Sequence, residues 1–197
     1  MTGAGKARPA AAETLHDNLE PSAWVQRWAR AVATGSTVLD LACGHGRHAR
    51  LFAARGCVVT AVDRDPECAV ALRGVHNVEF VCADLENGPW PFSSTFDLIV
   101  VANYLHRPLA GALLGALAPG GLLIYETFAA GNAAFGKPSN PDYLLAPREL
   151  LDTLGAELRI LAFEDGYVAS PKPAMIQRIA ARKSPPRSSL PADLCPL

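Results

Sequence analysis

The chain has 197 residues, of which 50% are hydrophobic, and a formal net charge of −1. This length and apolar content predict one domain with a full hydrophobic core, while the near-zero charge offers no large field for attracting nucleic acid. The five cysteines form no Cys-x-x-Cys pair, no apolar run could span a membrane, and the first twelve residues lack a secretory hydrophobic region, so we expect a reduced, cytoplasmic protein.

The predicted domain covers residues 14–183. Residues 1–13 are rich in Ala, Gly and Pro, and residues 184–197 contain four prolines and three serines. Segments of this composition bury too little apolar surface to fold, so we expect both ends to be flexible.

A first helix is predicted from about Pro21 to Ala33. Trp24, Val25 and Trp28 fall on one face of it at helical spacing, and Gly35 ends it. The apolar face predicts packing against the sheet.

The segment from Val38 to Gly46 constrains function more than any other part of the chain. An apolar run over Thr37–Leu41 predicts a buried strand, and the helix formers over Arg47–Arg55 predict a helix. Gly44 lies in the turn between them, where a glycine allows positive φ and lets a ligand approach the main chain at the amino end of the helix. This arrangement predicts a cofactor site.

Two classes of cofactor use such a turn. Gly44, Gly46 and Ala49 fit the dinucleotide pattern G-x-G-x-x-A, and Asp63 follows at the distance of a ribose-binding acid. Asp40, however, directs a carboxylate toward the place where a dinucleotide would put its pyrophosphate. Two anions there repel by about 4 kcal/mol at an effective dielectric of 20, so the acid favours a cationic ligand.

Strands and helices alternate along the rest of the chain, which predicts parallel pairing in a doubly wound α/β sheet with helices on both faces. Further helices are expected over residues 66–73, 108–117 and 147–154.

From its glycine turn onward, the chain resembles the class I S-adenosylmethionine-dependent methyltransferases. The family pattern of an acid followed by alternating small residues appears as Asp40, Ala42, Gly44 and Gly46, with Ala42 in place of the first glycine. The resemblance spans residues 36–128 and implies S-adenosylmethionine as cofactor. It implies further strands over residues 58–63, 78–85 and 96–101, and a turn into a fifth strand over residues 117–125. It also implies a Rossmann-like seven-stranded sheet, mostly parallel with an antiparallel final strand, whose last pair covers residues 158–164 and 174–181.

The resemblance assigns a role to each matched residue. Gly44 and Gly46 would pass beside the methionine part of the cofactor, and Asp40 would orient its ammonium. Asp63 would accept both ribose hydroxyls, and Asp84 would receive the adenine amino group. Leu85 would offer its backbone amide and its apolar side chain to the adenine ring. The remaining expected cofactor contacts are Ala42, Cys43, Arg64 and Asn103.

For Asp63 and Asp84 a simpler interpretation exists, because acids commonly end strands as turn residues or helix caps.

Acceptor-binding residues are expected at the carboxyl ends of the fourth and fifth strands, where ligands sit in such sheets. Asn103, Tyr104 and His106 follow the fourth strand and are the catalytic candidates. His106 is the candidate base because its unperturbed pKa lies near neutral pH, although it also fits a helix-start histidine before Pro108. The Asn-Pro-Pro-aromatic string of adenine and amide N-methyltransferases is absent here. Asn140-Pro141-Asp142-Tyr143 is read first as a turn.

No metal site is expected. Cys43, His45 and His48 cluster in the cofactor turn, but they lack a fourth ligand and the usual zinc spacing.

Residues 128–146 form a long connection in which Gly131, Gly136 and two prolines exclude a regular element. Because the segment leaves the ligand end of the fifth strand, we expect a lid that is mobile without ligands and closes over the substrate. The competing interpretation is a static cover or a protein-docking surface.

The sequence thus predicts methyl transfer to a small-molecule nucleophile by in-line displacement, and the chain most resembles the compact tellurite-resistance and thiol methyltransferases. We expect a monomer or homodimer. RNA or protein acceptors stay open because of Arg178, Arg182, Lys183 and Arg187. The sequence is also compatible with a noncatalytic cofactor-binding module and with an NAD-dependent enzyme.

Overall fold

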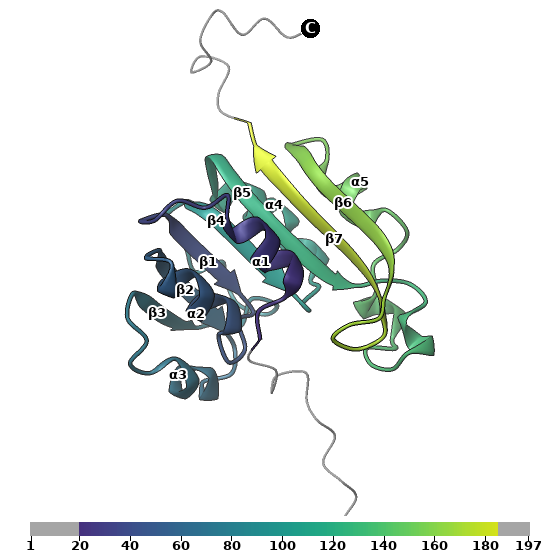
Figure 1. Ribbon diagram of the computed structural model, residues 1–197, viewed down its shortest axis with the longest axis horizontal. Helices are drawn as coiled ribbons and strands as arrows, with labels where there is room; N and C mark the ends of the chain where they lie inside the picture. The colour runs from purple at the N-terminus through teal and green to yellow at the C-terminus, as the bar shows by residue number, and fades with distance from the viewer. Residues whose placement is uncertain (1–19, 185–197) are drawn as a thin grey trace, which may run out of the picture.

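The computed structural model describes residues 20–184, which form one seven-stranded sheet with helices on both faces (Figure 1). The predicted flexible ends lie outside these residues, except for Ser184, and so do residues 14–19 of the predicted domain. The strand order is β3-β2-β1-β4-β5-β7-β6. The strands are β1 (Thr37–Leu41), β2 (Val58–Asp63), β3 (Val78–Cys82), β4 (Phe96–Ala102), β5 (Leu117–Phe128), β6 (Leu158–Val168) and β7 (Ala174–Lys183).

The strands from β1 to β5 pair in parallel, and β7 runs antiparallel to both of its neighbours, β5 and β6. The predicted fold class is therefore confirmed, including the antiparallel final strand. The carboxyl ends of β1 to β4 meet at one edge of the sheet, where ligands bind in doubly wound folds.

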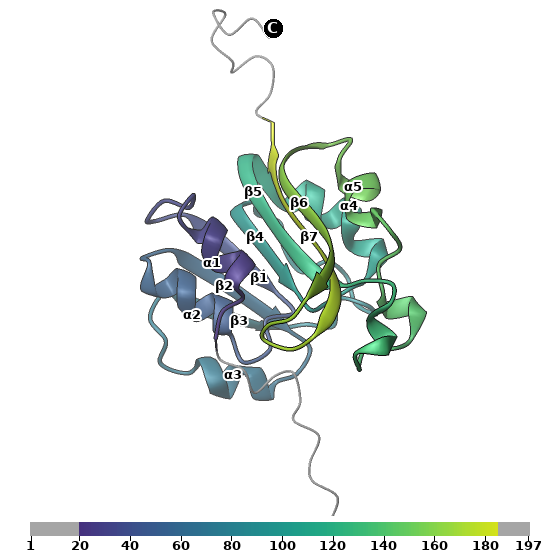
Figure 2. The same cartoon turned by 45° about the vertical axis from the view of Figure 1, so that its right-hand side comes forward.

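Two hydrophobic clusters fill the space between the sheet and its helices. On one face, α1 (Ala23–Ala29), α2 (Arg47–Ala54) and α3 (Glu67–Leu72) contribute Trp24, Phe52 and Leu72. On the other face, α4 (Ala110–Ala116) and α5 (Glu149–Leu154) contribute Leu113 and Leu154. Figure 2 shows α4 and α5 on the side of the sheet away from α1 and α2. No helix within residues 20–184 is both long enough and apolar enough to cross a membrane.

The first helix is shorter than predicted. The Ser22 hydroxyl accepts hydrogen bonds from the backbone N–H groups of Trp24 (3.1 Å) and Val25 (3.4 Å), so Ser22 is the N-cap and the helix begins at Ala23. After Ala29 the chain continues as a tighter turn, because Val32 donates its N–H to the carbonyl three residues earlier.

Residues 128–146 contain two short 3₁₀ turns, η2 (Asn132–Ala134) and η3 (Pro141–Tyr143), in place of a regular element. A third, η1 (Arg107–Leu109), precedes α4. An isolated bridge joins Ala129 to Leu145 and brings the two ends of the segment together.

Candidate functional site

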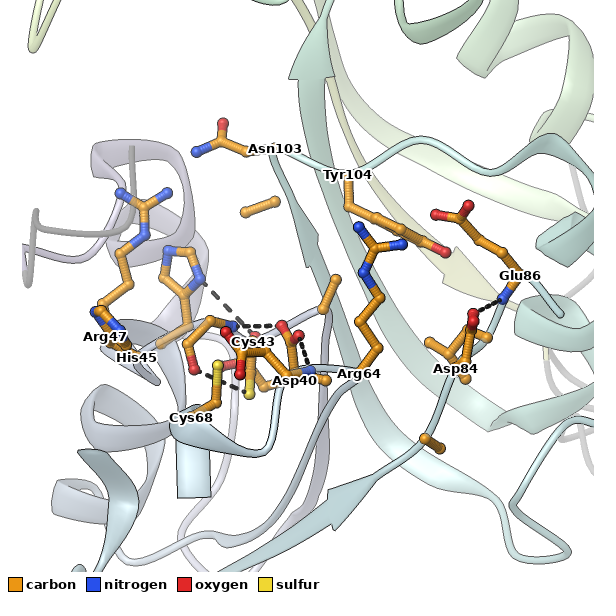
Figure 3. A pocket seen from close by; sticks show the side chains of 18 residues that line it. Asp40, Cys43, His45, Arg47, Arg64, Cys68, Asp84, Glu86, Asn103 and Tyr104 are labelled. Atoms are coloured by element: carbon orange, nitrogen blue, oxygen red, sulfur yellow. Dashed lines mark hydrogen bonds and ion pairs between the residues drawn. The ribbon is translucent and has the colours of Figure 1, made fainter. Parts of the chain in front are cut away.

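A cavity of about 530 Å³ opens at the carboxyl ends of β1 to β4 (Figure 3). Its lining includes every predicted cofactor or catalytic residue except Gly46 and His106. The predicted residues that line it are Asp40, Ala42, Cys43, Gly44, Asp63, Arg64, Asp84, Leu85, Asn103 and Tyr104. Further lining residues, which the sequence pattern does not assign to the cofactor site, include His45, Arg47, His48, Asp65, Cys68 and Glu86.

The turn after β1 follows a left-handed path. Gly44 has φ +53° and Gly46 has φ +75°, values that a glycine adopts without strain. Ala42, which stands where the family has its first glycine, has φ +52° and bears the cost of this conformation, about 1–2 kcal/mol. A glycine-like backbone is therefore kept at all three positions.

Gly46 is not among the residues that line the cavity, and its place beside the methionine part of the cofactor stays a prediction. It caps the start of α2, and a Cβ atom there would collide with the side chain of Leu72 in α3. Glycine at this position therefore serves the packing of α2 against α3.

Asp63 ties the end of β2 to the glycine turn. Its Oδ2 accepts the N–H of Gly44 at 2.9 Å, and its Oδ1 accepts the N–H of Asp65 at 3.0 Å. A carboxylate has about four lone-pair sites, so each oxygen can accept one more hydrogen bond from the cavity. Its role toward two ribose hydroxyls stays a prediction.

Asp84 both lines the cavity and shapes its own turn. Its Oδ1 accepts the backbone N–H groups of Glu86 (2.9 Å) and Asn87 (3.2 Å), while its Oδ2 accepts the Asn87 side-chain amide (2.9 Å). The Asn87 amide, followed by these backbone donors, lowers the pKa of Asp84, which keeps the carboxylate ionised. The simpler interpretation, a turn-forming acid, therefore holds alongside a place in the site.

Asp40 is almost fully buried, with 1% of its surface exposed, and its Oδ2 accepts the N–H of Ala49 at 2.8 Å. Burial raises the pKa of Asp40 to about 7, and the Ala49 hydrogen bond and the Arg47 charge oppose this rise. One oxygen is thus committed to the first turn of α2, and the other is directed toward His48.

His48 connects the cavity to α1, a role that the sequence does not predict. Its buried ring accepts the backbone N–H of Ser22 on Nε2 at 3.2 Å, and its Nδ1 lies 3.9 Å from Oδ1 of Asp40. Burial lowers the pKa of His48 to about 3, so the ring is neutral at physiological pH. Because Nε2 accepts a hydrogen bond, the proton of the neutral ring is assigned to Nδ1, facing Asp40.

The catalytic candidates after β4 are separated in the structure. Asn103 adopts a left-handed conformation (φ +57°) and donates its N–H to the carbonyl of Glu126 at 3.0 Å. Tyr104 lines the cavity, and its carbonyl accepts the hydroxyl of Tyr125 at 3.0 Å. His106 lies outside the cavity lining, because the chain turns away into η1 at this residue. The role of His106 as a base stays a prediction.

Within residues 20–184, no group of three or more Cys, His, Asp or Glu side chains is arranged to hold a metal ion. Burial raises the pKa of the Cys43 thiol far above its usual range, so the metal-binding thiolate is disfavoured there. Cys43 and Cys68 line the cavity as free thiols.

The segment over residues 128–146 is fastened by Arg107. The guanidinium forms a bidentate pair with Glu149, with distances of 2.6 Å and 3.0 Å, and donates to the carbonyls of Asp142 (2.7 Å) and Leu144 (3.0 Å). Asn132 is buried in the same segment and donates to the carbonyl of Pro138. No residue of the segment lines the cavity, so these contacts favour a static cover over a mobile lid.

The methyltransferase domain family matches residues 38–121, from β1 to the start of β5. No curated protein shows a significant match to the sequence. Among solved structures with this fold, TehB from Haemophilus influenzae has a TM-score of 0.70 at 18% identity, and the alignment covers 81% of this chain and 61% of the TehB chain. This chain thus spans less than two thirds of TehB.

Two further solved structures of this fold contain bound ligands. The N-methyltransferase NodS from Bradyrhizobium japonicum WM9, in complex with S-adenosyl-L-homocysteine, has a TM-score of 0.64 at 20% identity and covers 81% of this chain and 83% of its own. The 1,6-didemethyltoxoflavin-N1-methyltransferase from Burkholderia thailandensis, with bound 1,6-didemethyltoxoflavin and S-adenosylhomocysteine, has a TM-score of 0.60 at 22% identity and covers 82% and 79%. Residues 38–121 thus match a methyltransferase domain family, and the chain shares its fold with these methyltransferase structures.

Proposed function

We propose that the protein transfers the methyl group of S-adenosylmethionine to a small-molecule nucleophile by in-line displacement. The observation that carries this proposal is the cavity itself. The cavity is lined by the glycine turn after β1, by Asp63 at the end of β2, by Asp84 after β3 and by Asn103 after β4. This is the order that the family resemblance requires.

The hydrogen-bond acceptors and the apolar surface of the cavity suit this cofactor. Asp63 offers acceptors to hydroxyl groups, Asp84 offers one to an amino group, and the nearly buried Leu85 presents apolar surface between them and the core. Gly44 has no side chain, so a ligand can approach the main chain closely at this position. When bound, S-adenosylmethionine supplies a methyl group already activated by a sulfonium, so the protein mainly binds and orients the reactants.

The structural neighbours support a small acceptor, since one of them was solved with a small heterocycle. Asn103 and Tyr104, at the end of the cavity formed by β4, are the residues we assign to holding it. Burial, together with the negative charges of Glu86 and Asp84, raises the pKa of Tyr104, so this side chain acts as a neutral hydrogen-bonding group. We assign no general base.

Three of the four basic residues that leave an RNA acceptor open have hydrogen-bond partners in the structure. Arg178 pairs with Glu164, and Arg182 donates to the carbonyl of Gly120. Lys183 donates to the carbonyls of Leu114 in α4 and Leu117 at the start of β5. Cations engaged in this way form no open patch for a phosphate backbone, which favours the small acceptor. Arg187 lies outside the described residues.

A labelled-methyl assay tests the proposal. Protein and S-adenosylmethionine with a labelled methyl group are incubated separately with small thiols, amines, phenols, tellurite and total RNA, and products are identified by mass spectrometry. We expect label in a small product and loss of transfer in Asp63→Ala. Label found only in RNA or protein would contradict the acceptor class. Binding of the cofactor without transfer to any acceptor would favour the noncatalytic module.

A further inference from the structure

The start of α1 is bonded to two side chains of the cavity wall. Ser22, the N-cap of α1, donates its backbone N–H to Nε2 of His48 at 3.2 Å, and the carbonyl of Glu20 accepts Nη1 of Arg47 at 3.3 Å. His48 and Arg47 both line the cavity, whereas residues 20–22 are not part of the lining. The segment before α1 therefore acts on the cavity through these two side chains of α2.

The bond from Ser22 determines which nitrogen of His48 carries the proton. The ring is 3% exposed and neutral, and a neutral imidazole has one donor and one acceptor nitrogen. Because Nε2 accepts the N–H of Ser22, the proton is on Nδ1, which faces Oδ1 of Asp40 at 3.9 Å. This distance exceeds that of a hydrogen bond, so the contact is an electrostatic one between the N–H dipole and the carboxyl oxygen.

Asp40 is a buried residue of the cavity, so the position of its carboxyl group is sensitive to this contact. Its Oδ2 accepts the N–H of Ala49 at 2.8 Å, while Oδ1 has the donor nitrogen of His48 as its neighbour. In the other tautomer, the lone pair on Nδ1 would point at Oδ1 and repel it. Such repulsion is strong in a buried environment of low dielectric. The N–H of Ser22 therefore disfavours the form of His48 that would push Asp40 away from its position.

We propose that His48 is a positioning residue of the ligand cavity, with Ser22 as the group that fixes its tautomer. The imidazole holds the carboxyl group of Asp40 in place, and it does so only while α1 is docked against α2 through Ser22. This inference rests on the proposed function, because the position of Asp40 matters for catalysis only if the cavity binds the methyl donor. It extends the functional unit beyond residues 38–121, which match the family, to the start of α1.

Two substitutions of His48 separate its two contacts. The amide oxygen of Gln takes the place of Nε2 and accepts the N–H of Ser22, but this side chain has no donor at the place of Nδ1. The shorter Asn presents an amide donor near the place of Nδ1 and does not reach Ser22. His48→Gln therefore keeps the contact to α1, and His48→Asn keeps the contact to Asp40. Exposed His76, outside the cavity lining, supplies the control His76→Gln.

Calorimetry with S-adenosylhomocysteine, urea unfolding and ¹⁵N NMR of the imidazole rings test the proposal. We expect the His48 signals, identified by their absence in His48→Asn, to show a proton on Nδ1. His48→Gln should bind S-adenosylhomocysteine about 3- to 10-fold more weakly than the wild type, and His48→Asn should show a smaller loss. Stability should follow the opposite order, because only His48→Gln keeps the bond to α1. His76→Gln should match the wild type in affinity and in stability.

A proton on Nε2 would overturn the inference, and so would an unchanged affinity in His48→Gln. If affinity followed stability, with His48→Gln binding more tightly than His48→Asn, His48 would only anchor α1. The NMR measurement uses the wild type, so it decides the tautomer even if a variant does not fold. A wild type that binds no S-adenosylhomocysteine at millimolar concentration would overturn the proposed function together with the inference, whereas the three preceding results overturn the inference alone.

Discussion

The N–H of Gly44 donates to Oδ2 of Asp63 at 2.9 Å, so the acid that ends β2 holds the glycine turn that ends β1. The two functional elements are 19 positions apart in sequence and are joined by one hydrogen bond at the cavity wall. Binding of a ligand by Asp63 is therefore coupled to the shape of the turn.

Asp63→Ala should weaken binding of S-adenosylhomocysteine about 100-fold, because two hydroxyl hydrogen bonds to a carboxylate contribute about 1.5 kcal/mol or more each. Isothermal titration calorimetry measures the change. Asp152→Ala is the control, since this exposed carboxylate lies on α5, outside the cavity lining. An unchanged dissociation constant in a folded Asp63→Ala protein would remove Asp63 from the site.

Gly46→Ala should destabilise the fold more than Gly74→Ala. Both glycines have nearly the same φ, +75° and +77°, so the backbone strain of an added Cβ is matched. At Gly46 the new methyl group meets Leu72, whereas nothing lies within 4 Å of it at Gly74. We expect an additional loss of about 1–3 kcal/mol in urea unfolding for Gly46→Ala. Equal losses in the two variants would show that Leu72 yields without cost.

His48→Gln should change the pH dependence of stability. The unfolded histidine binds a proton below 6.5, whereas folded His48 does so only below about 3, so the unfolded state holds more protons between these values. The wild type should therefore gain stability over the variant as pH rises through this window, by at most about 1.4 kcal/mol per pH unit.

Asp40 changes the stability of the fold with pH in the opposite direction to His48, so Asp40→Asn is a second test. Its folded pKa of about 7 lies above the ordinary 3.8, so its contribution to stability is lost as pH rises between these values. Asp40→Asn should remove this loss, and the stability of the variant relative to the wild type should rise with pH. Urea unfolding at pH 4.5 and 6.5 compares all three proteins. Differences between them that do not change with pH would contradict the buried, neutral state of His48.

Arg107→Gln should release the segment over residues 128–146. The wild-type contacts close this segment, and the N–H of Leu145 bonds the carbonyl of Phe128 at 3.0 Å. We expect hydrogen exchange in the segment to be slow in the free wild type and faster in the variant, with exposed Arg159→Gln on β6 as control. Fast exchange in the free wild type that slows on ligand binding would instead establish the mobile lid predicted from the sequence.

The sequence is sufficient for the parts of the site that depend on local pattern. Strand ends, the glycine turn, Asp63 and Asp84 follow one another at spacings set by the βα units, and they line one cavity because parallel strands end at one edge. The simpler turn-forming role of Asp84 is equally visible from its position.

The features that the sequence does not predict depend on contacts between distant segments. The bond from Ser22 to His48 spans 26 positions, so no local pattern around His48 predicts it. Gly46 fits the ligand-binding pattern of the turn. The side chain that a Cβ atom at Gly46 would meet is Leu72, which lies in α3. Arg47 follows the turn directly, and its charge at the start of α2 is the signal that could mark it.

The cavity beside Gly44 is the proposed binding site of the methyl donor. The most direct test of this proposal is calorimetric titration of the wild-type protein with S-adenosylhomocysteine and, separately, with NADH. We predict saturable binding of one S-adenosylhomocysteine per chain that Asp63→Ala weakens, and no heat of binding with NADH. Binding of NADH, with no binding of S-adenosylhomocysteine at millimolar concentration, would contradict the assignment.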